Sequence, residues 1–273
     1  INTEIVERPY QLEAIQRVAE TFVTDNANGI CGNKRRALLV MATGSGKTRT
    51  AAAMVDVLIK NNWVKRVLFL ADRNALVRQA KNNFSEYLPE LSSIDLTENK
   101  ENETTRLVFS TYPSMMNKID NTKNGEERFY GVGHFDLIII DEAHRSIYNR
   151  YKAIFDYFDA CIVGLTATPK DGIDHNTFEL FSCSTEDPTF LYELNQAVPT
   201  YLSAYKNIDI KSKFLREGIK YKDLSPTDKA KYEETFIDRT TGLFPEEIRS
   251  NAMNKWLFNE DTVNKVLDAL MEK

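Results

Sequence analysis

Short apolar runs recur through the first two thirds of the chain, separated by more polar stretches. Each run is about as long as one β-strand and is apolar at nearly every position. Such runs are typical of strands that are covered on both faces, as in a parallel sheet. The pattern predicts strands at Ala37–Met41, Arg66–Ala71, Arg106–Ser110, Asp136–Asp141 and Cys161–Thr166.

The segments between these runs carry apolar residues three or four positions apart, which is the spacing of one helix face. These residues are Leu12, Ile15, Ala19 and Phe22, then Ala51, Val55, Leu58 and Ile59, and then Leu76, Ala80 and Phe84. Strands that alternate with helices favour βαβ units. We therefore predict a three-layer α/β domain with a mostly parallel sheet over residues 1–170.

The alternation stops after this domain. Residues 171–245 hold scattered aromatic residues and turn signals, so we expect an extended, irregular connector with one strand near Tyr205–Ile210. Residues 246–273 regain helical spacing, which predicts a helix at Glu246–Leu257 and a second helix after it. The chain opens on isoleucine rather than methionine, and the last predicted helix has no stop signal. We expect a piece of a longer protein.

Composition excludes several classes of protein. The 273 residues are 42% hydrophobic and 27% charged, which is enough apolar material for a sizeable core and too much for a disordered chain. The three cysteines are widely spaced, unlike those of a disulfide scaffold. No apolar run is long enough to cross a membrane and no signal peptide opens the chain, so we expect a cytoplasmic protein.

The net charge of −5 argues weakly against a nucleic-acid partner, because phosphate-binding proteins usually carry a basic surplus. The distribution of charge changes this picture. Residues 1–169 contain 21 basic and 21 acidic residues, whereas residues 170–273 contain 14 and 19. The excess acid therefore lies in the last third, and the first domain can still carry local phosphate contacts.

A glycine-rich loop follows the first predicted strand and precedes a predicted helix. Its sequence is Met41-Ala42-Thr43-Gly44-Ser45-Gly46-Lys47-Thr48. Loops of this kind let backbone N–H groups surround phosphate oxygens at the positive end of a helix. We predict that Lys47 reaches the β- and γ-phosphates of ATP and that the Thr48 hydroxyl coordinates Mg²⁺. The strict pattern has glycine where Met41 stands.

Polar residues also follow two later strands. Asp141 and Glu142 end a buried strand, at the edge where ligands bind in open α/β sheets. We predict that Asp141 holds Mg²⁺, directly or through water, and that Glu142 orients and deprotonates the attacking water. The hydroxyls of Thr166 and Thr168 end another strand and can sense the γ-phosphate. The alternative there is a plain strand end closed by proline.

Together these motifs resemble those of superfamily 2 helicases and translocases, in their first RecA-like domain, which is a three-layer P-loop NTPase fold. Gly44–Thr48 looks like motif I, in a form of the loop that the family tolerates without its first glycine. Asp141–His144, which reads DEAH, looks like motif II, and Thr166–Pro169 looks like motif III. The resemblance implies that His144 and the two threonines couple the nucleotide site to the nucleic-acid face.

Arg8-Pro9-Tyr10-Gln11 is similar to the Q motif of the same superfamily. This similarity implies that Gln11 reads the adenine edge and that Arg8 or Tyr10 flanks the base. A helix start after proline is the alternative interpretation.

Two further segments are similar to motifs Ia and Ib, namely Leu70–Leu76 and Phe109–Tyr112. In the family these loops contact the nucleic-acid backbone, which implies such contacts for Arg73, Ser110 and Thr111. The alternatives are a salt-bridged helix cap at Arg73 and a capped turn at the other two residues.

The stretches around the motifs narrow the match. VLFLADRNALVRQA, FDLIIIDEAHRSIYNRY and FDYFDACIVGLTATP resemble the restriction subunit of type I restriction–modification enzymes, as do Lys213–Asp223 and Asn254–Lys273. The resemblance implies an ATP-dependent translocase on double-stranded DNA. It also implies methyltransferase and specificity subunits as partners, and a nuclease domain and a second RecA-like domain elsewhere in the parent chain. The second domain supplies an arginine finger, which accelerates related phosphoryl transfers by roughly 10³–10⁵. Because that domain is not in this sequence, we expect this piece to hydrolyse ATP weakly.

Other functions remain open at this point. A type III restriction subunit, or a free-standing superfamily 2 helicase on DNA or RNA, would share these motifs. A nucleotide-gated binding module without turnover is a different class, and the intact Lys47, Asp141 and Glu142 argue against it. A small-molecule kinase would need a lid and a substrate pocket instead of the threonine motif.

Overall fold

The computed structural model forms two compact units, Ile1–Ala204 and Tyr205–Lys273. It describes residues 1–26, 29–32, 34–98, 102, 104–120, 122–123, 127–128, 130–143, 145–168, 173, 175–183, 187–204, 219–224, 226, 229, 232–233 and 244–248. Within these residues, no helix has both the length and the apolar character needed to cross a membrane.

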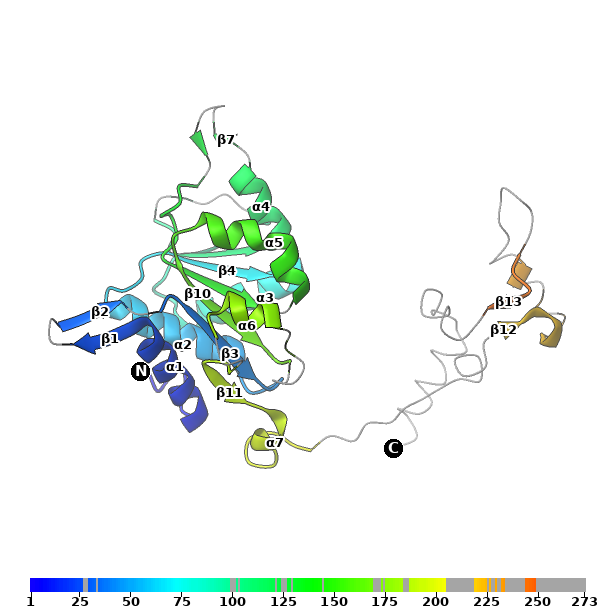
Figure 1. Cartoon of the computed structure of the whole chain (residues 1–273), viewed down its shortest axis with the longest axis horizontal. Coiled ribbons are helices and arrows are strands. Elements are labelled where there is room, and N and C mark those ends of the chain that lie inside the picture. The colour runs from blue at the N-terminus through cyan, green and yellow to red at the C-terminus, as the bar shows by residue number, and fades with distance from the viewer. Residues whose placement is uncertain are drawn as a thin grey trace. The chain divides into compact units, whose positions relative to one another are not determined.

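The first unit is built on a seven-stranded sheet in the order β11-β3-β10-β9-β4-β6-β5 (Figure 1). All neighbouring strands run parallel. The five predicted strands are confirmed as β3 (Arg36–Met41), β4 (Val67–Ala71), β6 (Leu107–Thr111), β9 (Leu137–Asp141) and β10 (Cys161–Thr166). Two short strands form the edges of the sheet, β5 (Ser93–Asp95) and β11 (Phe190–Tyr192).

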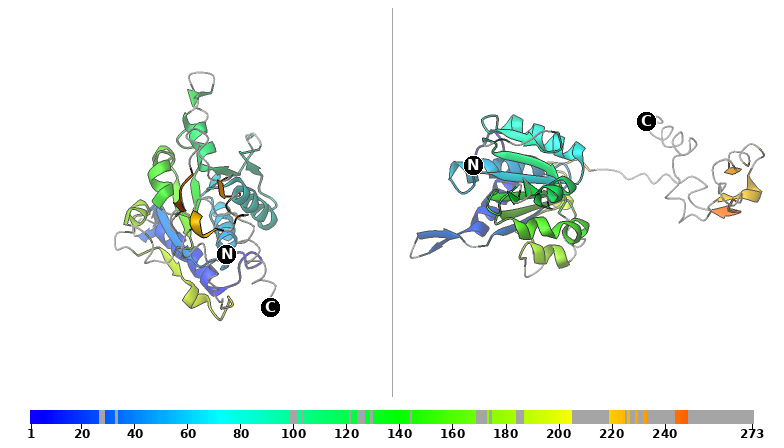
Figure 2. Two further views of the ribbon diagram at one scale, coloured as in Figure 1. Left: turned by 90° about the vertical axis from the view of Figure 1, so that its right-hand side faces the viewer. Right: turned by 90° about the horizontal axis from the view of Figure 1, so that it is seen from above.

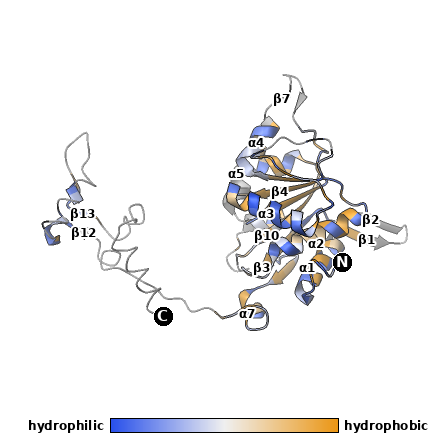
Figure 3. Ribbon diagram, turned by 180° about the vertical axis from the view of Figure 1, so that it is seen from behind, coloured by the Kyte–Doolittle hydropathy of each residue, from blue (hydrophilic) through white to orange (hydrophobic). Residues whose placement is uncertain are grey.

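Helices cover both faces of this sheet (Figures 1 and 2). One face carries α1 (Pro9–Phe22), α2 (Lys47–Lys60) and α3 (Asn74–Tyr87), and the other carries α4 (Tyr112–Asp120), α5 (Arg145–Tyr157) and α6 (His175–Leu180). Alternate residues of β9 serve the two faces, because Ile139 belongs to the first core and Ile140 to the second. Figure 3 shows the apolar strands of the sheet between helices that mix polar and apolar residues. The predicted three-layer α/β fold is confirmed.

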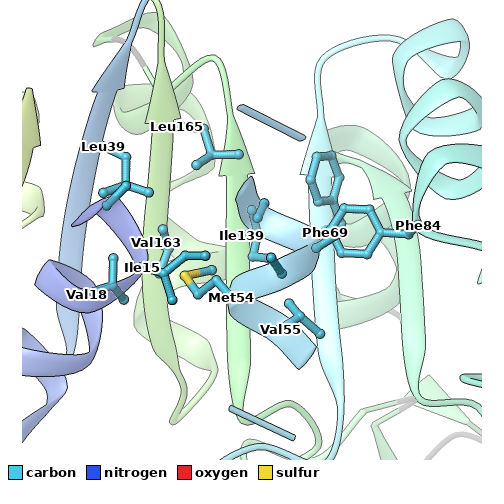
Figure 4. Close-up of a cluster of buried hydrophobic side chains, with 14 of the residues drawn as sticks. Ile15, Val18, Leu39, Met54, Val55, Phe69, Phe84, Ile139, Val163 and Leu165 are labelled. Carbon is cyan, nitrogen blue, oxygen red and sulfur yellow. The ribbon is translucent and has the colours of Figure 1, made fainter. Parts of the chain in front are cut away.

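The core beneath α1 and α2 brings the first residues of both helices to the same edge of the sheet. Ile15 and Val18 of α1 and Met54 of α2 pack against β3 and β10 in one buried cluster (Figure 4). Full burial of one such side chain stabilises the fold by roughly 1.5–3 kcal/mol. The same packing therefore sets where α1 lies relative to the glycine-rich loop.

The structure differs from the sequence prediction after residue 170. β11 pairs in parallel with β3, and α7 (Leu194–Ala197) places Ala197 in the core, so the first compact unit continues to Ala204. A strand of three residues is too short to show a period in the sequence. β11 forms because it pairs with the otherwise open edge of β3, and the sequence pattern does not show which strand lies at the edge of the sheet.

Smaller elements lie outside the central sheet. A hairpin of β1 (Val23–Asn26) and β2 (Gly29–Gly32) projects from the end of α1 (Figure 2), and β7 (Thr122–Lys123) pairs with β8 (Glu127–Arg128). In the second unit, β12 (Ile219–Lys220) pairs antiparallel with β13 (Glu247–Ile248) and is followed by the 3₁₀ turn η2 (Tyr221–Asp223).

One sequence prediction is wrong in this second unit. A helix was expected to begin at Glu246, but Glu247 and Ile248 form a strand, and Ile248 packs on Tyr232. Pairing with β12 outweighs the local helical spacing, because tertiary contacts override weak propensities. The remainder of the predicted helix, the helix after it and the strand near Tyr205–Ile210 lie outside the described residues.

Candidate nucleotide site

The glycine-rich loop joins β3 to α2 at the carboxyl edge of the sheet. Gly44 and Gly46 have φ angles of +82° and +89°, in the left-handed region that glycine adopts without steric cost. Ser45 closes the turn on Ala42, because its N–H and its hydroxyl donate to the Ala42 carbonyl at 3.1 and 2.6 Å. Lys47 and Thr48 follow at the start of α2, partly exposed.

This geometry fits a phosphate group. Backbone N–H groups and the positive end of a helix favour an anion at such a loop, and Lys47 adds a charge there. The Thr43 side chain is exposed on the same loop. The Gly44 backbone lies under Leu202, whose Cδ2 is 3.4 Å from the position that a Cβ would take. Leu202 therefore covers the Gly44 backbone on the side where a side chain would lie.

The start of α1 contacts this loop directly. The Tyr10 hydroxyl and the Gln11 Nε2 both donate to the Ser45 carbonyl, at 2.8 and 3.2 Å. Arg8 Nη1 donates in turn to the Tyr10 hydroxyl at 3.0 Å. The three residues predicted to bind adenine are thus linked to the glycine-rich loop, Arg8 by way of Tyr10.

Two aromatic residues that the sequence interpretation missed complete this region. The Tyr10 ring stacks on Tyr192 at 3.9 Å between centroids, and Tyr201 meets it edge-on at 5.2 Å. The Arg8 guanidinium lies 5.2 Å from the centre of the Tyr201 ring. Tyr201 is 37% exposed, whereas Tyr10 is 6% exposed, so Tyr201 is the more accessible ring for a flat ligand. No motif marked these tyrosines, because β11 brings them into place.

A cavity of about 570 Å³ lies beside this cluster and is lined by α1, β11 and the segment after α7, including Tyr10, Tyr192 and Tyr201. A larger cavity of about 680 Å³ lies at the opposite edge of the sheet, where Lys65, Arg66 and Asp136 precede their strands. That second cavity contains none of the predicted site residues.

The acidic pair lies at the end of β9, on the same edge of the sheet as the loop. Burial, and then the neighbouring Glu142, raise the pKa of Asp141, whereas the charge of Lys47 lowers it. Glu142 adopts a φ of +54°, which is unusual for a residue with a side chain. The Ala143 N–H donates to the Leu165 carbonyl of β10 at 2.9 Å, which anchors the turn to the next strand.

The threonine motif lies directly beside the acids. β10 pairs with β9 so that Leu165 is opposite Asp141. Thr166 is fully buried, and its hydroxyl accepts the Thr168 N–H at 3.1 Å. This bond closes a local turn at the end of β10. His144 and Pro169 lie outside the described residues.

The metal site predicted at Thr48 and Asp141 has few protein ligands. Where the structure describes side chains, no group of three His, Cys, Asp or Glu residues could hold a metal ion. One hydroxyl and one carboxylate nevertheless fit Mg²⁺ at a nucleotide, since that ion keeps waters and binds phosphate oxygens in such sites.

The candidate nucleic-acid residues differ in accessibility. β4 pairs with β6 so that their ends adjoin, which brings motif Ia beside motif Ib. The Arg73 side chain is 81% exposed, with Asp72 3.8 Å away. Ser110 is fully buried and its hydroxyl donates to the Thr111 carbonyl at 3.1 Å, while the Thr111 hydroxyl bonds Ser114 at 2.9 Å. Arg73 is therefore the residue of the three that a phosphate can reach without rearrangement.

Comparisons with known proteins show what this chain is similar to. The family described as "Type III restriction enzyme, res subunit" matches residues 4–171. The chain is 35% identical over 211 residues to the type I restriction enzyme EcoAI endonuclease subunit of Escherichia coli, covering 74% of this chain and 24% of that subunit. It is 30% identical over 222 residues to the EcoKI endonuclease subunit of Escherichia coli K12, covering 72% and 17%.

A solved structure supports the fold. The helicase domain of Hef from Pyrococcus furiosus matches with a TM-score of 0.54 at 21% identity, over 76% of this chain and 43% of that one. The chain spans about a quarter or less of the length of the two curated subunits.

Proposed function

The chain belongs to the family of type III restriction enzyme res subunits, and we propose that it is the ATP-binding half of a motor that moves along double-stranded DNA. The observation that carries this proposal is the arrangement around the glycine-rich loop. Lys47 begins α2 close enough to Asp141 that its charge lowers the pKa of that carboxyl, and Glu142 is the next residue. A phosphate-binding cation and two acids at one sheet edge suit hydrolysis of a nucleoside triphosphate.

ATP and Mg²⁺ are the proposed ligands. The backbone of Thr43–Gly46 and the Lys47 ammonium bind the phosphates, while Gln11 contacts the adenine edge and the rings near Arg8 flank the base. Thr48 and Asp141 hold Mg²⁺, which neutralises charge on the β- and γ-phosphate oxygens when it is bound.

Hydrolysis is assigned to Glu142. Its carboxylate orients the attacking water and accepts a proton from it, as a general base at hydrogen-bond distance does. Thr166 and Thr168 respond to the γ-phosphate from the neighbouring strand, with His144 as the third coupling residue. Closure of a second RecA-like domain over the nucleotide, and its release after hydrolysis, would convert this cycle into steps along DNA.

The proposed track is the phosphate backbone of double-stranded DNA. Arg73 supplies an exposed charge at the end of β4, and Thr111 lies beside it at the end of β6. Backbone contacts position a protein on DNA without reading sequence, which suits a motor. Methyltransferase and specificity subunits, and the nuclease domain of the parent chain, are the proposed partners.

A type I restriction enzyme is the proposed parent. The matched family carries a type III description, whereas the two curated relatives are endonuclease subunits of type I enzymes, at 35% and 30% identity. Purification of the full-length protein with co-expressed methyltransferase and specificity subunits tests this assignment. A three-component complex supports a type I parent, and a complex that lacks a specificity subunit supports a type III parent.

The Glu142→Gln variant of the full-length protein tests the motor itself. We expect DNA-stimulated ATP hydrolysis to fall by roughly 10²–10⁴, the contribution of a positioned base, while ATP binding is retained. Glu86→Gln, at an exposed position of α3, is the matched control and should hydrolyse ATP normally. Wild-type hydrolysis by Glu142→Gln would refute the proposal. ATP binding without any DNA-stimulated turnover in the unmodified protein would instead support a nucleotide-gated binding module.

A further inference from the structure

Tyr112 is a fully buried polar side chain with no part in the mechanism described above. It begins α4, directly after Ser110 and Thr111. Buried polar groups keep a hydrogen-bond partner, because an unpaired one costs free energy. The Tyr112 hydroxyl donates to the carbonyl oxygen of Asp141, at 3.2 Å.

The peptide group between Asp141 and Glu142 is thus held at both of its polar atoms. Its carbonyl accepts the Tyr112 hydroxyl, and its N–H donates to Oδ1 of Asp141 at 3.2 Å. Glu142 lies in the left-handed region, with φ of +54°. Such a conformation is strained for a residue with a side chain and persists only where the surroundings hold it. The hydroxyl of Tyr112 is one of the groups that hold this turn.

The ring of Tyr112 is fixed as well. It stacks on Tyr151 at 5.1 Å between centroids and 18° between planes. Tyr151 marks a kink inside α5, with φ of −121° and ψ of 17°. The stacked ring therefore holds the hydroxyl at the Asp141 carbonyl.

We propose that Tyr112 is a positioning residue for ATP hydrolysis, because its hydroxyl holds the Asp141 carbonyl and thereby sets the turn that aims the Glu142 carboxylate. This inference rests on the proposed function, since it assigns Tyr112 a role in the reaction of Glu142. The same hydroxyl joins the start of α4, next to the candidate DNA-contacting residues, to the peptide that carries the catalytic acid.

The test is Tyr112→Phe in the full-length protein with DNA present. The substitution keeps the ring and removes only the donor. Since a positioned base contributes roughly 10²–10⁴ in rate, we expect misalignment of Glu142 to lower kcat about tenfold to a hundredfold. The KM for ATP should stay within about twofold, because the glycine-rich loop and Lys47 are untouched. A kcat equal to that of the unmodified protein, at an unchanged Tm, would overturn the inference.

Tyr157→Phe is the matched control. The Tyr157 hydroxyl donates to the Tyr130 carbonyl from the last residue of α5, so this variant also removes a phenolic donor to a backbone carbonyl. Its kcat should equal that of the unmodified protein. A fall in kcat as large as that of Tyr112→Phe would overturn the inference, since it would mean that general loosening slows hydrolysis.

A second pair of variants covers the case in which Tyr112→Phe fails to fold. Replacement of Tyr112 by p-aminophenylalanine keeps a donor, and replacement by p-methylphenylalanine keeps the size without one. The p-aminophenylalanine variant should hydrolyse ATP about tenfold faster than the p-methylphenylalanine variant. Equal rates of hydrolysis by these two variants would overturn the inference. If Glu142→Gln lowers the rate of hydrolysis while the Tyr112 variants that lack a donor keep the rate of the unmodified protein, only this inference fails and the proposed function stands.

Discussion

The side-chain amide of Gln11 occupies the space that a Cβ atom at Gly46 would need. Gln11 Nε2 lies 2.7 Å from that position and donates to the Ser45 carbonyl at 3.2 Å. Gly46 also has a φ of +89° as the residue that caps α2. The first turn of α1 therefore closes over the backbone of the loop, and a side chain at position 46 would displace the Gln11 amide and strain the left-handed backbone.

Gly46→Ala should disrupt both the loop and its contact with Gln11. The left-handed conformation costs a residue with a side chain roughly 1–2 kcal/mol, and the clash adds to that cost. We expect a lower Tm and ATP binding weakened about tenfold or more, measured by thermal unfolding and by titration with a fluorescent ATP analogue. Gly133→Ala is the control, since a Cβ there meets nothing within 4 Å. Equal behaviour of the two variants would contradict the prediction.

Gly164→Ala should destabilise the fold. Gly164 lies in β10, and a Cβ there would be 2.3 Å from Cζ of Phe181, which follows α6. Overpacking of this kind typically costs about 1–3 kcal/mol of unfolding free energy, which urea denaturation measures. Adding Phe181→Leu should recover part of the lost unfolding free energy, because the smaller leucine leaves room for the alanine Cβ at position 164. If the changes in unfolding free energy of the two substitutions simply add, the two positions are independent and the prediction is wrong.

Asp141→Asn should stabilise the nucleotide-free protein at neutral pH. Burial and Glu142 raise the pKa of Asp141 above the ordinary carboxyl value of 3.8. When the pKa of a carboxyl is higher in the folded protein than in the unfolded chain, protonation of that carboxyl stabilises the folded state. Its contribution to stability is therefore complete below pH 3.8 and is lost as the pH rises through the raised pKa.

The amide of the Asp141→Asn variant carries no charge and can still accept the Glu142 N–H. We therefore expect a higher Tm than that of the unmodified protein at neutral pH, with the gain shrinking as the pH falls. Asp72→Asn is the control, because the Asp72 side chain is 57% exposed and should give no such gain. A lower Tm for Asp141→Asn in nucleotide-free protein at neutral pH would contradict the prediction.

Arg73→Ala should weaken binding of the full-length protein to duplex DNA by a similar factor for all sequences. Loss of one phosphate contact should also reduce the slope of log affinity against log salt by about 1. Ser110→Ala should have little effect, because the Ser110 hydroxyl is buried and bonded to the Thr111 carbonyl. Arg17→Ala, on the exposed face of α1, is the charge-matched control. If Ser110→Ala weakens DNA binding more than Arg73→Ala does, Arg73 is not the main phosphate contact of the two.

The sequence alone determined the central sheet and the candidate residues at its carboxyl edge. Lys47, Asp141 and Glu142 each stand in a contiguous motif next to a long apolar strand. Parallel strands deliver their carboxyl ends to one edge, so local patterns were enough to predict that these residues share a site. Each of the buried strands is apolar at most of its positions, which made the existence of these strands predictable.

Only the tertiary structure decided which other residues surround that edge. Tyr192 and Tyr201 reach the site because β11, a strand of three residues, pairs with β3. Tyr112 acts on Asp141 through a backbone carbonyl, and every residue type carries that acceptor. An edge strand of three residues is too short to show a hydrophobic period in the sequence. A backbone carbonyl is present at every residue, so a hydrogen bond to it does not restrict which residue type stands there. These relationships therefore appear only once the strands are paired and the helices are packed on them.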